Sequence, residues 1–451
     1  GGNITIGNNL TLTTGTLNIG ANSIDRGAAG GAFTLSSGAL LQIAAANLPA
    51  NYSTVSIAAT STVEYNPSFN MTVPDPGGGQ SYGNLLLSNS GNRTFNAAIT
   101  IAGNLTATGT VAAVMNAGIT VNGSVDIGAN TSFDPKAYTH TFKGNYTNNG
   151  STISDATNTS TIVMNGTSAQ AISGTGLYFY NLTANNSLGV TTSTSFSIAK
   201  NFTNDAGFGV TGTPTTTFNG TTAQAIGGAT APAFYNLTLN NSTGLTINND
   251  VTVNNTMTFT AGNVTTGTGN TLIVGSSGSV ARTSGHVVGR LRKYFPTGSS
   301  ISREFEIGEG TNYLPVSISS ASVSTAGYLT VYMTAGDHPN LGGSGSNIDP
   351  TKSVNRYWTL TKEGTLAFSS YNATFNYLST DNDDTTVVAD YIVQRYLSGT
   401  WNNTTLTTPD PSTTQTSISG ESGDGAFAIG RSTVAAFERE NEFVYSRELS
   451  Y

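Results

Sequence analysis

The residues best suited to hold a metal ion form a short acidic cluster late in the chain. Asp381, Asp383 and Asp384 surround Asn382, so three carboxylates and one amide lie within four residues. Calcium takes six to eight oxygen ligands of these kinds. The cluster is shorter than an EF-hand loop and lacks the glycine and the terminal glutamate of that loop. It therefore predicts either a calcium site or a solvated turn between two strands.

Residue patterns for catalysis are scarce. The three histidines, His140, His286 and His338, lie far apart and show no metal-ligand spacing. The chain has no cysteine, no G-x-S-x-G elbow and no glycine-rich phosphate loop in a strand–helix setting. We therefore expect no enzyme and no cofactor other than the calcium considered above. A polysaccharide-degrading β-helix enzyme stays an alternative, because folding could bring distant carboxylates together.

Charge and hydropathy exclude two classes of partner. The 451 residues carry 17 Lys+Arg against 25 Asp+Glu, a net charge of −8, and the one basic cluster is Arg290, Arg292 and Lys293. Nucleic acid needs many clustered cations to neutralise its phosphates. No apolar run approaches the roughly 18 residues of a membrane span. We therefore expect neither a nucleic-acid partner nor a membrane span, and we interpret the basic cluster as an edge strand or a salt contact.

Short alternating segments must position these residues. Leu10–Leu12, Leu245–Ile247 and Val251–Val253 each read apolar, Thr, apolar, and similar segments recur every six to eight residues through the first part of the chain. The two-residue period is typical of strands with one buried face. This spacing is closer than the roughly 8–12 residues between strands of a sandwich. It predicts an all-β fold with a parallel β-solenoid, resembling a right-handed β-helix, over residues 1–280.

A longer phrase occurs twice in this region. TIVMNGTSAQAI (Thr161–Ile172) corresponds to TTTFNGTTAQAI (Thr215–Ile226), 54 residues later. FYNLTANNSLGV (Phe179–Val190) corresponds to FYNLTLNNSTGL (Phe234–Leu245), 55 residues later. Repeats with periods of this length are typical of stacked architectures. Each copy is expected to span two or three coils of the solenoid.

The composition changes near residue 280. Residues 1–280 contain 13 charged residues, whereas residues 281–433 and the tail that follows contain 29. Longer strand patterns separated by proline and charged loops predict an antiparallel β-sandwich over residues 281–433. Trp401 and Tyr396 lie in this region, and exposed aromatic rings near its loops would stack on sugars. They are our candidate glycan-binding residues.

Residues 434–451 form a third segment with a different composition. One third of this tail is charged, and it also contains Phe443, Val444, Tyr445, Leu449 and Tyr451. A strand of this kind could add to an open sheet edge of a neighbouring copy, with main-chain hydrogen bonds supplying the affinity. A head-to-tail contact that does not close on itself makes a filament. The five apolar and aromatic residues are therefore our candidate assembly residues.

Residues 60–433 resemble a known group of secreted proteins. The phrases NGTTAQAI, FYNLTLNNSTGLTINNDVTVNNTMTF, GHVVGRLRKYFPTG and VNRYWTLT resemble repeats, and the β-sandwich that follows them, in large surface proteins of the Bacteroidota, green-sulfur and Ignavibacteria lineages. Many of those proteins end in a type IX sorting domain, which is not recognisable here. The resemblance implies export from a bacterium and extracellular or cell-surface placement, and it carries over no catalytic residue.

These observations support one functional hypothesis and two alternatives. The hypothesis is a non-enzymatic extracellular structural protein, a filament or surface-layer subunit joined to other copies of itself by strand addition. The first alternative is a cell-surface adhesin or stalk that binds glycans. The second is the polysaccharide-degrading enzyme. Because the chain begins inside a strand pattern without an initiator methionine, we also expect a processed or truncated product.

Overall fold

The computed structural model describes residues 2–45, 47–154, 158–385, 388–407, 412 and 414–433. The chain is almost all β, with 58% of its residues in strands, and contains a parallel β-solenoid of about 14 turns and antiparallel sheets in its C-terminal part. The predicted fold class is confirmed. Contacts divide the chain into a solenoid unit (Gly1–Val253 and Thr260–Gly262) and a C-terminal unit (Asn254–Phe259 and Asn263–Tyr451).

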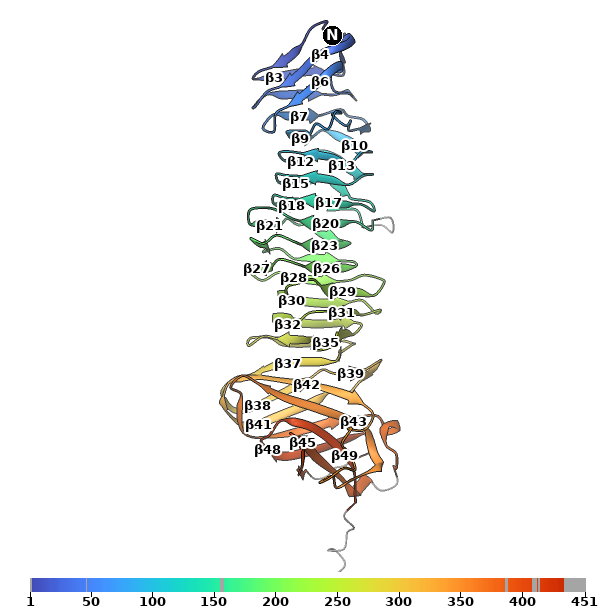
Figure 1. Ribbon diagram of the computed structural model, residues 1–451, viewed down its shortest axis with the longest axis vertical. Helices are drawn as coiled ribbons and strands as arrows, with labels where there is room; N and C mark the ends of the chain where they lie inside the picture. Colours follow the sequence, from blue (N-terminus) through green and yellow to red (C-terminus); the bar gives the residue numbers. More distant parts are fainter. Residues whose placement is uncertain are drawn as a thin grey trace, which may run out of the picture. The chain divides into compact units, whose positions relative to one another are not determined.

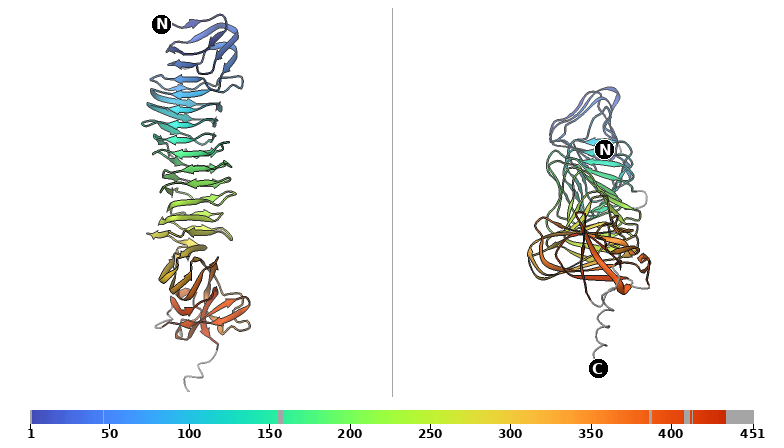
Figure 2. Two further views of the ribbon diagram at one scale, coloured as in Figure 1. Left: turned by 90° about the vertical axis from the view of Figure 1, so that its left-hand side faces the viewer. Right: turned by 60° about the horizontal axis from the view of Figure 1, so that its bottom comes forward.

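The solenoid unit is built from ladders of short parallel strands, stacked one above another in Figure 1 and seen from further directions in Figure 2. The first ladder contains β3 (Thr16–Gly20), β5 (Leu40–Ile43), β7 (Thr62–Tyr65), β9 (Asn84–Leu87), β12 (Leu105–Ala107), β15 (Val125–Ile127), β18 (Tyr146–Asn148), β21 (Gln170–Ser173), β24 (Val190–Thr192) and β27 (Phe208–Val210). The second contains β11 (Ile99–Ile101), β14 (Ile119–Val121), β17 (Thr139–Phe142), β20 (Thr161–Met164), β23 (Asn181–Ala184), β26 (Asn201–Asn204), β29 (Gln224–Gly227) and β31 (Leu245–Ile247).

The remaining side of each coil is formed by other strands. One ladder contains β8 (Met71–Thr72), β10 (Ser90–Phe95), β13 (Thr110–Met115), β16 (Ser132–Asp134) and β19 (Ser151–Thr152). A later ladder contains β22 (Tyr178–Phe179), β25 (Phe196–Ile198), β28 (Thr215–Phe218) and β30 (Ala233–Asn240). The first coils add β1 (Ile4–Thr5), β2 (Leu10–Leu12), β4 (Ile24–Leu35) and β6 (Ala50–Ile57).

Alternating residues fill the inside of the solenoid. Ile99 pairs with Ile119 in the next coil, so one coil here takes 20 residues, as the predicted short coils require. Strand β31 shows the pattern, because Leu245 and Ile247 are buried while Thr246 between them is not. In the middle of the stack the core is aromatic, and the Phe202 ring lies 5.0 Å from the ring of Phe208. Burial of these apolar surfaces is the main favourable term in folding.

The C-terminal unit begins with further parallel strands and then changes to antiparallel pairing. The parallel strands are β32 (Val251–Ala261), β33 (Val264–Thr266), β34 (Thr271–Val274), β35 (Ser279–Arg282) and β36 (Val287–Val288). Strand β37 (Arg290–Phe295) pairs in parallel with β34 and antiparallel with β42 (Gly327–Ala335). Parallel pairing therefore extends past residue 280, where we placed the end of the solenoid.

Two antiparallel sheets follow. One contains β37, β42, β43 (Ile348–Glu363), β49 (Gly425–Ser432), β45 (Tyr391–Leu397) and β46 (Thr400–Asn403). The other contains β38 (Gly298–Phe305), β41 (Val316–Thr325), β44 (Ala367–Asn376), β48 (Gln415–Glu421) and β47 (Thr405–Leu406). A hairpin, β39 (Gly308–Glu309) with β40 (Asn312–Tyr313), and two 3-10 turns, η1 (Ser379–Asp381) and η2 (Val388–Asp390), complete the unit. No helix in these described ranges is long and apolar enough to cross a membrane.

The two antiparallel sheets face each other across an aromatic core. Trp358 of β43 is fully buried, and its ring lies 5.0 Å from that of Phe375, which belongs to β44 in the other sheet. Phe427 of β49 lies 5.4 Å from the same Phe375 ring. This contact between the inner faces is the packing expected of a β-sandwich.

Candidate binding groove on the solenoid

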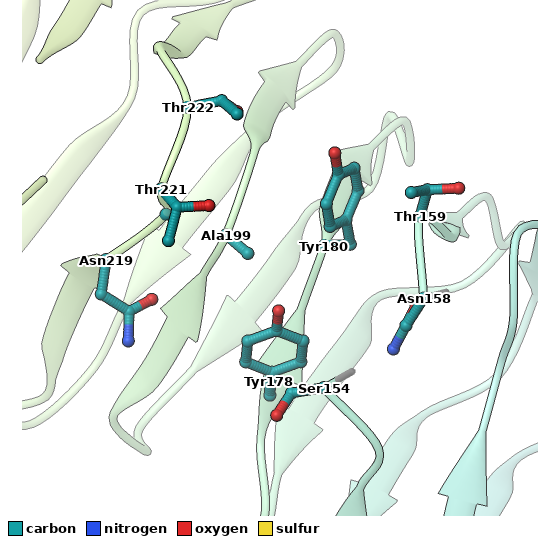
Figure 3. Close-up of a pocket in the computed structure, with 10 residues that line it drawn as sticks. Ser154, Asn158, Thr159, Tyr178, Tyr180, Ala199, Asn219, Thr221 and Thr222 are labelled. Carbon is teal, nitrogen blue, oxygen red and sulfur yellow. The ribbon is translucent and has the colours of Figure 1, made fainter. Parts of the chain in front are cut away.

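A groove on the outer face of the solenoid unit is the best candidate for a binding site (Figure 3). Its central side chains come from β22 and the residue that follows it. Phe179 points into the core and is 1% exposed. Because side chains alternate along a strand, Tyr178 and Tyr180 point outward together, and both are half-buried. The local sequence Tyr-Phe-Tyr thus anchors the coil and presents two rings on its surface.

The next two coils leave room beside these rings. Tyr178 pairs with Ser197, and the amide of Ala199 donates to the carbonyl of Phe179, so a small residue follows each tyrosine in the ladder. The turn after β28, residues 219–222, then forms the wall of the groove on the far side of Ala199. The result is a hollow of about 510 Å³ with a small floor and taller sides. Its lining residues are Ser154, Asn158, Thr159, Tyr178, Tyr180, Ala199, Asn219, Gly220, Thr221 and Thr222.

The lining residues that the structure describes are mostly polar, and none of them carries a charge. Figure 3 shows Tyr178 and Tyr180 between Asn219–Thr222 on one side and Ser154, Asn158 and Thr159 on the other. Within the described residues, the hydroxyls of both tyrosines make no hydrogen bond to the protein. Burial, followed by the neighbouring Tyr180, raises the pKa of Tyr178. The groove therefore presents neutral phenols, hydroxyls and amides to solvent, which can donate and accept hydrogen bonds.

One cation lies near the rim, and the protein already binds it. The Nζ atom of Lys200 donates to the Oγ1 atom of Thr222 at 3.1 Å and to the carbonyl of Ala223 at 2.7 Å. These contacts hold the ammonium group against the turn. They also fix one wall of the groove, because Thr222 belongs to that turn.

The repeated phrase itself builds the coils. Gln170, at the start of β21 in the first copy, is 2% exposed. Its Nε2 atom donates to the carbonyls of Phe142 (2.9 Å) and Gly144 (2.6 Å) in the preceding coil. Its Oε1 atom accepts from the amide of Gly166 (2.8 Å) and from Nδ2 of Asn186 (2.9 Å) in the following coil. We call this arrangement the amide staple, because one buried amide joins three coils through hydrogen bonds to their backbone and to Asn186.

The second copy makes the same staple. Nε2 of Gln224 donates to the carbonyls of Ile198 (2.8 Å) and Lys200 (3.3 Å), and its Oε1 atom accepts from the amide of Gly220 (3.1 Å) and from Asn241 (2.9 Å). Sequence analysis found the repeat but not its cause. The sequence motif that both copies share is therefore explained by the hydrogen bonds that its glutamine makes to the backbone, and it needs no ligand to explain it.

The two copies differ at one outward position of the groove. Phe179 corresponds to Phe234 and Tyr180 to Tyr235, but Tyr178 corresponds to Ala233. Sequence analysis did not single out Tyr178. The available signal was this departure from the repeat, since a residue that breaks a structural pattern on the surface is a candidate for function.

The predicted calcium ligands face protein donors. Asp381 forms a two-pronged ion pair with Arg356, with Nε–Oδ2 and Nη2–Oδ1 distances of 3.1 and 3.2 Å. Asp383 accepts from Nδ2 of Asn355 at 2.7 Å, and Asp384 follows outside any strand. In the part of the chain that the structure describes, no three His, Asp or Glu side chains are grouped so that they could hold a metal. The calcium site stays a prediction, and these contacts give two of the three carboxylates a structural role.

The predicted glycan-binding pair does not form an exposed platform. Trp401 is only 7% exposed, and its Nε1 atom donates to the carbonyl of Asn340 at 3.1 Å. The Trp401 ring lies 5.0 Å from the ring of Tyr396 and 5.1 Å from that of His338. The expectation of an exposed Trp401 is wrong, because its ring packs against Tyr396, its cross-strand neighbour in the β45–β46 hairpin, and against His338 from an earlier segment. Whether Tyr396 contacts a ligand stays untested.

The histidines and the basic cluster also have structural surroundings. His140 is buried in the solenoid unit, where its Nε2 atom lies 2.8 Å from the carbonyl of Pro135. In the C-terminal unit, Lys293 forms a buried ion pair with Glu306 at 2.5 Å, and Arg292 pairs with Glu363 at 3.1 Å. These cations are neutralised by carboxylates of their own unit.

The predicted assembly residues Phe443, Val444, Tyr445, Leu449 and Tyr451 lie outside the described residues. Comparisons with known proteins add no assignment to any of these sites. A scan against protein-family models, a search of curated proteins and a search of solved structures each found no match.

Proposed function

We propose that this chain is a non-enzymatic structural protein that acts outside the cell as a filament or surface-layer subunit. The observation that carries the proposal is the continuous solenoid core, in which buried backbone groups are satisfied by repeated amide staples. Such a stack supplies length and rigidity from neighbour-to-neighbour contacts alone. The small number of charged residues before residue 280 also argues against acid–base catalysis on this scaffold.

Assembly by strand addition needs an edge that can accept a strand. Strand β3 pairs with β5 on one side and has no partner on its other side among the described residues. Two apolar side chains of the first coils, Leu10 and Leu17, are only half-buried, and Ile4 is 45% exposed. An unpaired strand with adjacent apolar surface is a template for another chain. We propose that the tail of residues 434–451 of a second copy occupies it.

Electron microscopy and light scattering of the purified chain test this proposal. We expect filaments from the intact chain and monomers from a chain that ends at residue 433. A second variant, Thr16→Lys, places a charge at an exposed position of β3 and should also give monomers, whereas the control Thr16→Ser should not. An intact chain that stays monomeric at high concentration would overturn the filament role. Filaments from the shortened chain would overturn the part assigned to the tail.

A further inference from the structure

We propose that the groove around Tyr178 and Tyr180 binds a neutral, hydroxyl-rich glycan. This inference does not depend on filament formation, since the groove lies within the solenoid unit. It also differs from the glycan site expected at Trp401, which is buried. Four observations on the described residues support it: the paired aromatic rings, the unpaired polar groups, the lack of charge among the lining residues and the hydrogen bonds that hold residues of both walls.

The two rings supply an aromatic surface in a polar hollow. Tyr178 and Tyr180 are two residues apart on an extended segment, so their Cα atoms are roughly 6–7 Å apart. The C–H faces of a sugar ring pack on the face of an aromatic ring, and the tyrosine hydroxyl adds a polar group at the edge. Binding sites commonly combine such apolar surfaces with a few placed hydrogen-bonding groups. Figure 3 shows both rings standing in the middle of the groove.

The polar groups fit hydroxyls better than ionised groups. Thr159, Thr221 and Asn219 contribute side chains that make no hydrogen bond to the protein within the described residues. None of the described lining residues is charged, and Asp155 lies outside the described residues. The nearby ammonium group of Lys200 is directed at Thr222 and Ala223. A sulfated or carboxylated ligand would therefore lose its hydration without gaining an opposite charge, whereas sugar hydroxyls would exchange water for neutral partners.

Hydrogen bonds to the protein hold the described residues on both sides of the groove. The staple holds the turn on one side, because Gly220 donates to Gln224 and Nδ2 of Asn241 donates to the carbonyl of Thr222 at 2.7 Å. On the other side, Asn158 donates to the carbonyl of Ile153 and accepts from the amide of Ser160. A site that is already ordered avoids the entropy cost of ordering on binding. The repeat thus makes a rigid frame, and Tyr178 adds the feature that the second copy lacks.

Binding of defined oligosaccharides to the intact chain tests the proposal. The probes are neutral glucan, mannan and galactan fragments, with sulfated and uronic-acid oligosaccharides of similar length for comparison. We expect saturable binding of at least one neutral series by calorimetry. Tyr178→Ala should weaken it by about tenfold or more, because the stacking surface is lost. Tyr178→Phe keeps the ring and should weaken it less.

The repeat supplies a matched control. Tyr235→Ala removes the tyrosine of the second copy that corresponds to Tyr180; Tyr235 is not among the lining residues of the groove, so this change should leave the affinity unchanged. Three results would overturn the proposal: no binding of any neutral series at millimolar concentration, a clear preference for the charged oligosaccharides, or equal losses for Tyr178→Ala and Tyr235→Ala. Circular dichroism and hydrogen exchange of each variant confirm that the coils remain folded.

Discussion

The two copies of the repeat, residues 161–192 and 215–247, share the buried glutamine staple and a close glycine contact, and they differ at an outward position of the groove. Both place a buried glutamine where it joins neighbouring coils, and both use the same glycine at the same tight approach. Only the first copy has a tyrosine at position 178, where the second has Ala233. The shared glutamine and glycine therefore mark requirements of the backbone, and the outward difference at Tyr178 marks a surface position that is free to serve a ligand.

Among the variants that compare the two copies, we expect the largest loss of stability at the shared glycine. Gly174 and Gly228 have φ values of 118° and 112°, and an added Cβ would lie 2.1 Å from the carbonyl oxygen of Asn148 or 2.3 Å from that of Asn204. Alanine at either position combines backbone strain with overlap, so we expect a loss of about 4 kcal/mol in the free energy of unfolding. Urea denaturation measures it.

A control variant separates the effect of backbone strain from the effect of overlap with the neighbouring coil. Gly212 also has a positive φ, of 70°, but no atom lies within 4 Å of an added Cβ. Gly212→Ala should cost only the strain, about 1 kcal/mol. If Gly174→Ala and Gly228→Ala were no worse than Gly212→Ala, the close approach of successive coils would not be a constraint on the repeat.

The staple glutamines come next. Gln170→Leu and Gln224→Leu fill a similar volume but remove the glutamine partner of one glycine amide in each copy, Gly166 or Gly220, and of one carbonyl, that of Gly144 or Lys200. Each should lower the stability of the solenoid by about 3 kcal/mol. The two losses should be equal within error, because the two staples have the same partners in both copies. The exposed Gln80→Leu is the control, with an expected change below about 0.5 kcal/mol.

A pH experiment extends the comparison to the C-terminal unit. The amide staples have no titratable group, but His286 is buried there, and burial followed by Arg282 lowers its pKa from 6.5 to about 4. The ring is neutral in the folded state at pH values where the unfolded chain is protonated. Its contribution to stability is thus complete above pH 6.5 and is lost as the pH falls toward 4, with a total of about 3 kcal/mol.

The variant His286→Phe keeps a ring in this position, beside Tyr313. It should remove this part of the pH dependence when the stability of the C-terminal unit is measured between pH 7 and 4.5. An unchanged pH profile in the variant would show that other groups cause the acid sensitivity.

The smallest effect on stability is expected at Tyr178. Tyr178→Ala converts the first copy to the residue of the second copy, and the side chain is only half-buried. We expect a loss of about 0.5–1 kcal/mol by urea denaturation. A loss as large as that of the staple variants would mean that Tyr178 is part of the core packing, and the surface difference between the copies would lose its functional meaning.

Local pattern was enough to predict the architecture. The alternation in Leu245–Ile247 depends on neighbouring residues only, and it correctly indicated a strand with one buried face. The position where parallel pairing ends was less accessible, because Arg290–Phe295 pairs in parallel on one side and antiparallel on the other. The sequence of one strand does not show which other strands pair with it, or in which direction they run.

The sites could not be predicted in the same way, because they depend on register between distant coils. Trp401 packs against Tyr396, its neighbour in a hairpin, and also against His338, and the sequence distance to His338 hides that contact. The groove needs Tyr180, Ala199 and Asn219 to become neighbours across three coils. The positions of these residues in the sequence indicated neither the burial of Trp401 nor the groove. The departure of Tyr178 from the repeat was visible in the sequence.

Hydrogen exchange of three variants, followed by mass spectrometry, tests the central claim most directly. The claim is that the features shared by the two copies hold the coils together and that the differing tyrosine does not. We predict that Gln170→Leu and Gln224→Leu each lose protection in the coils around the altered staple, while Tyr178→Ala keeps the protection of the unaltered chain. Lost protection in Tyr178→Ala, or full protection in both glutamine variants, would contradict the account.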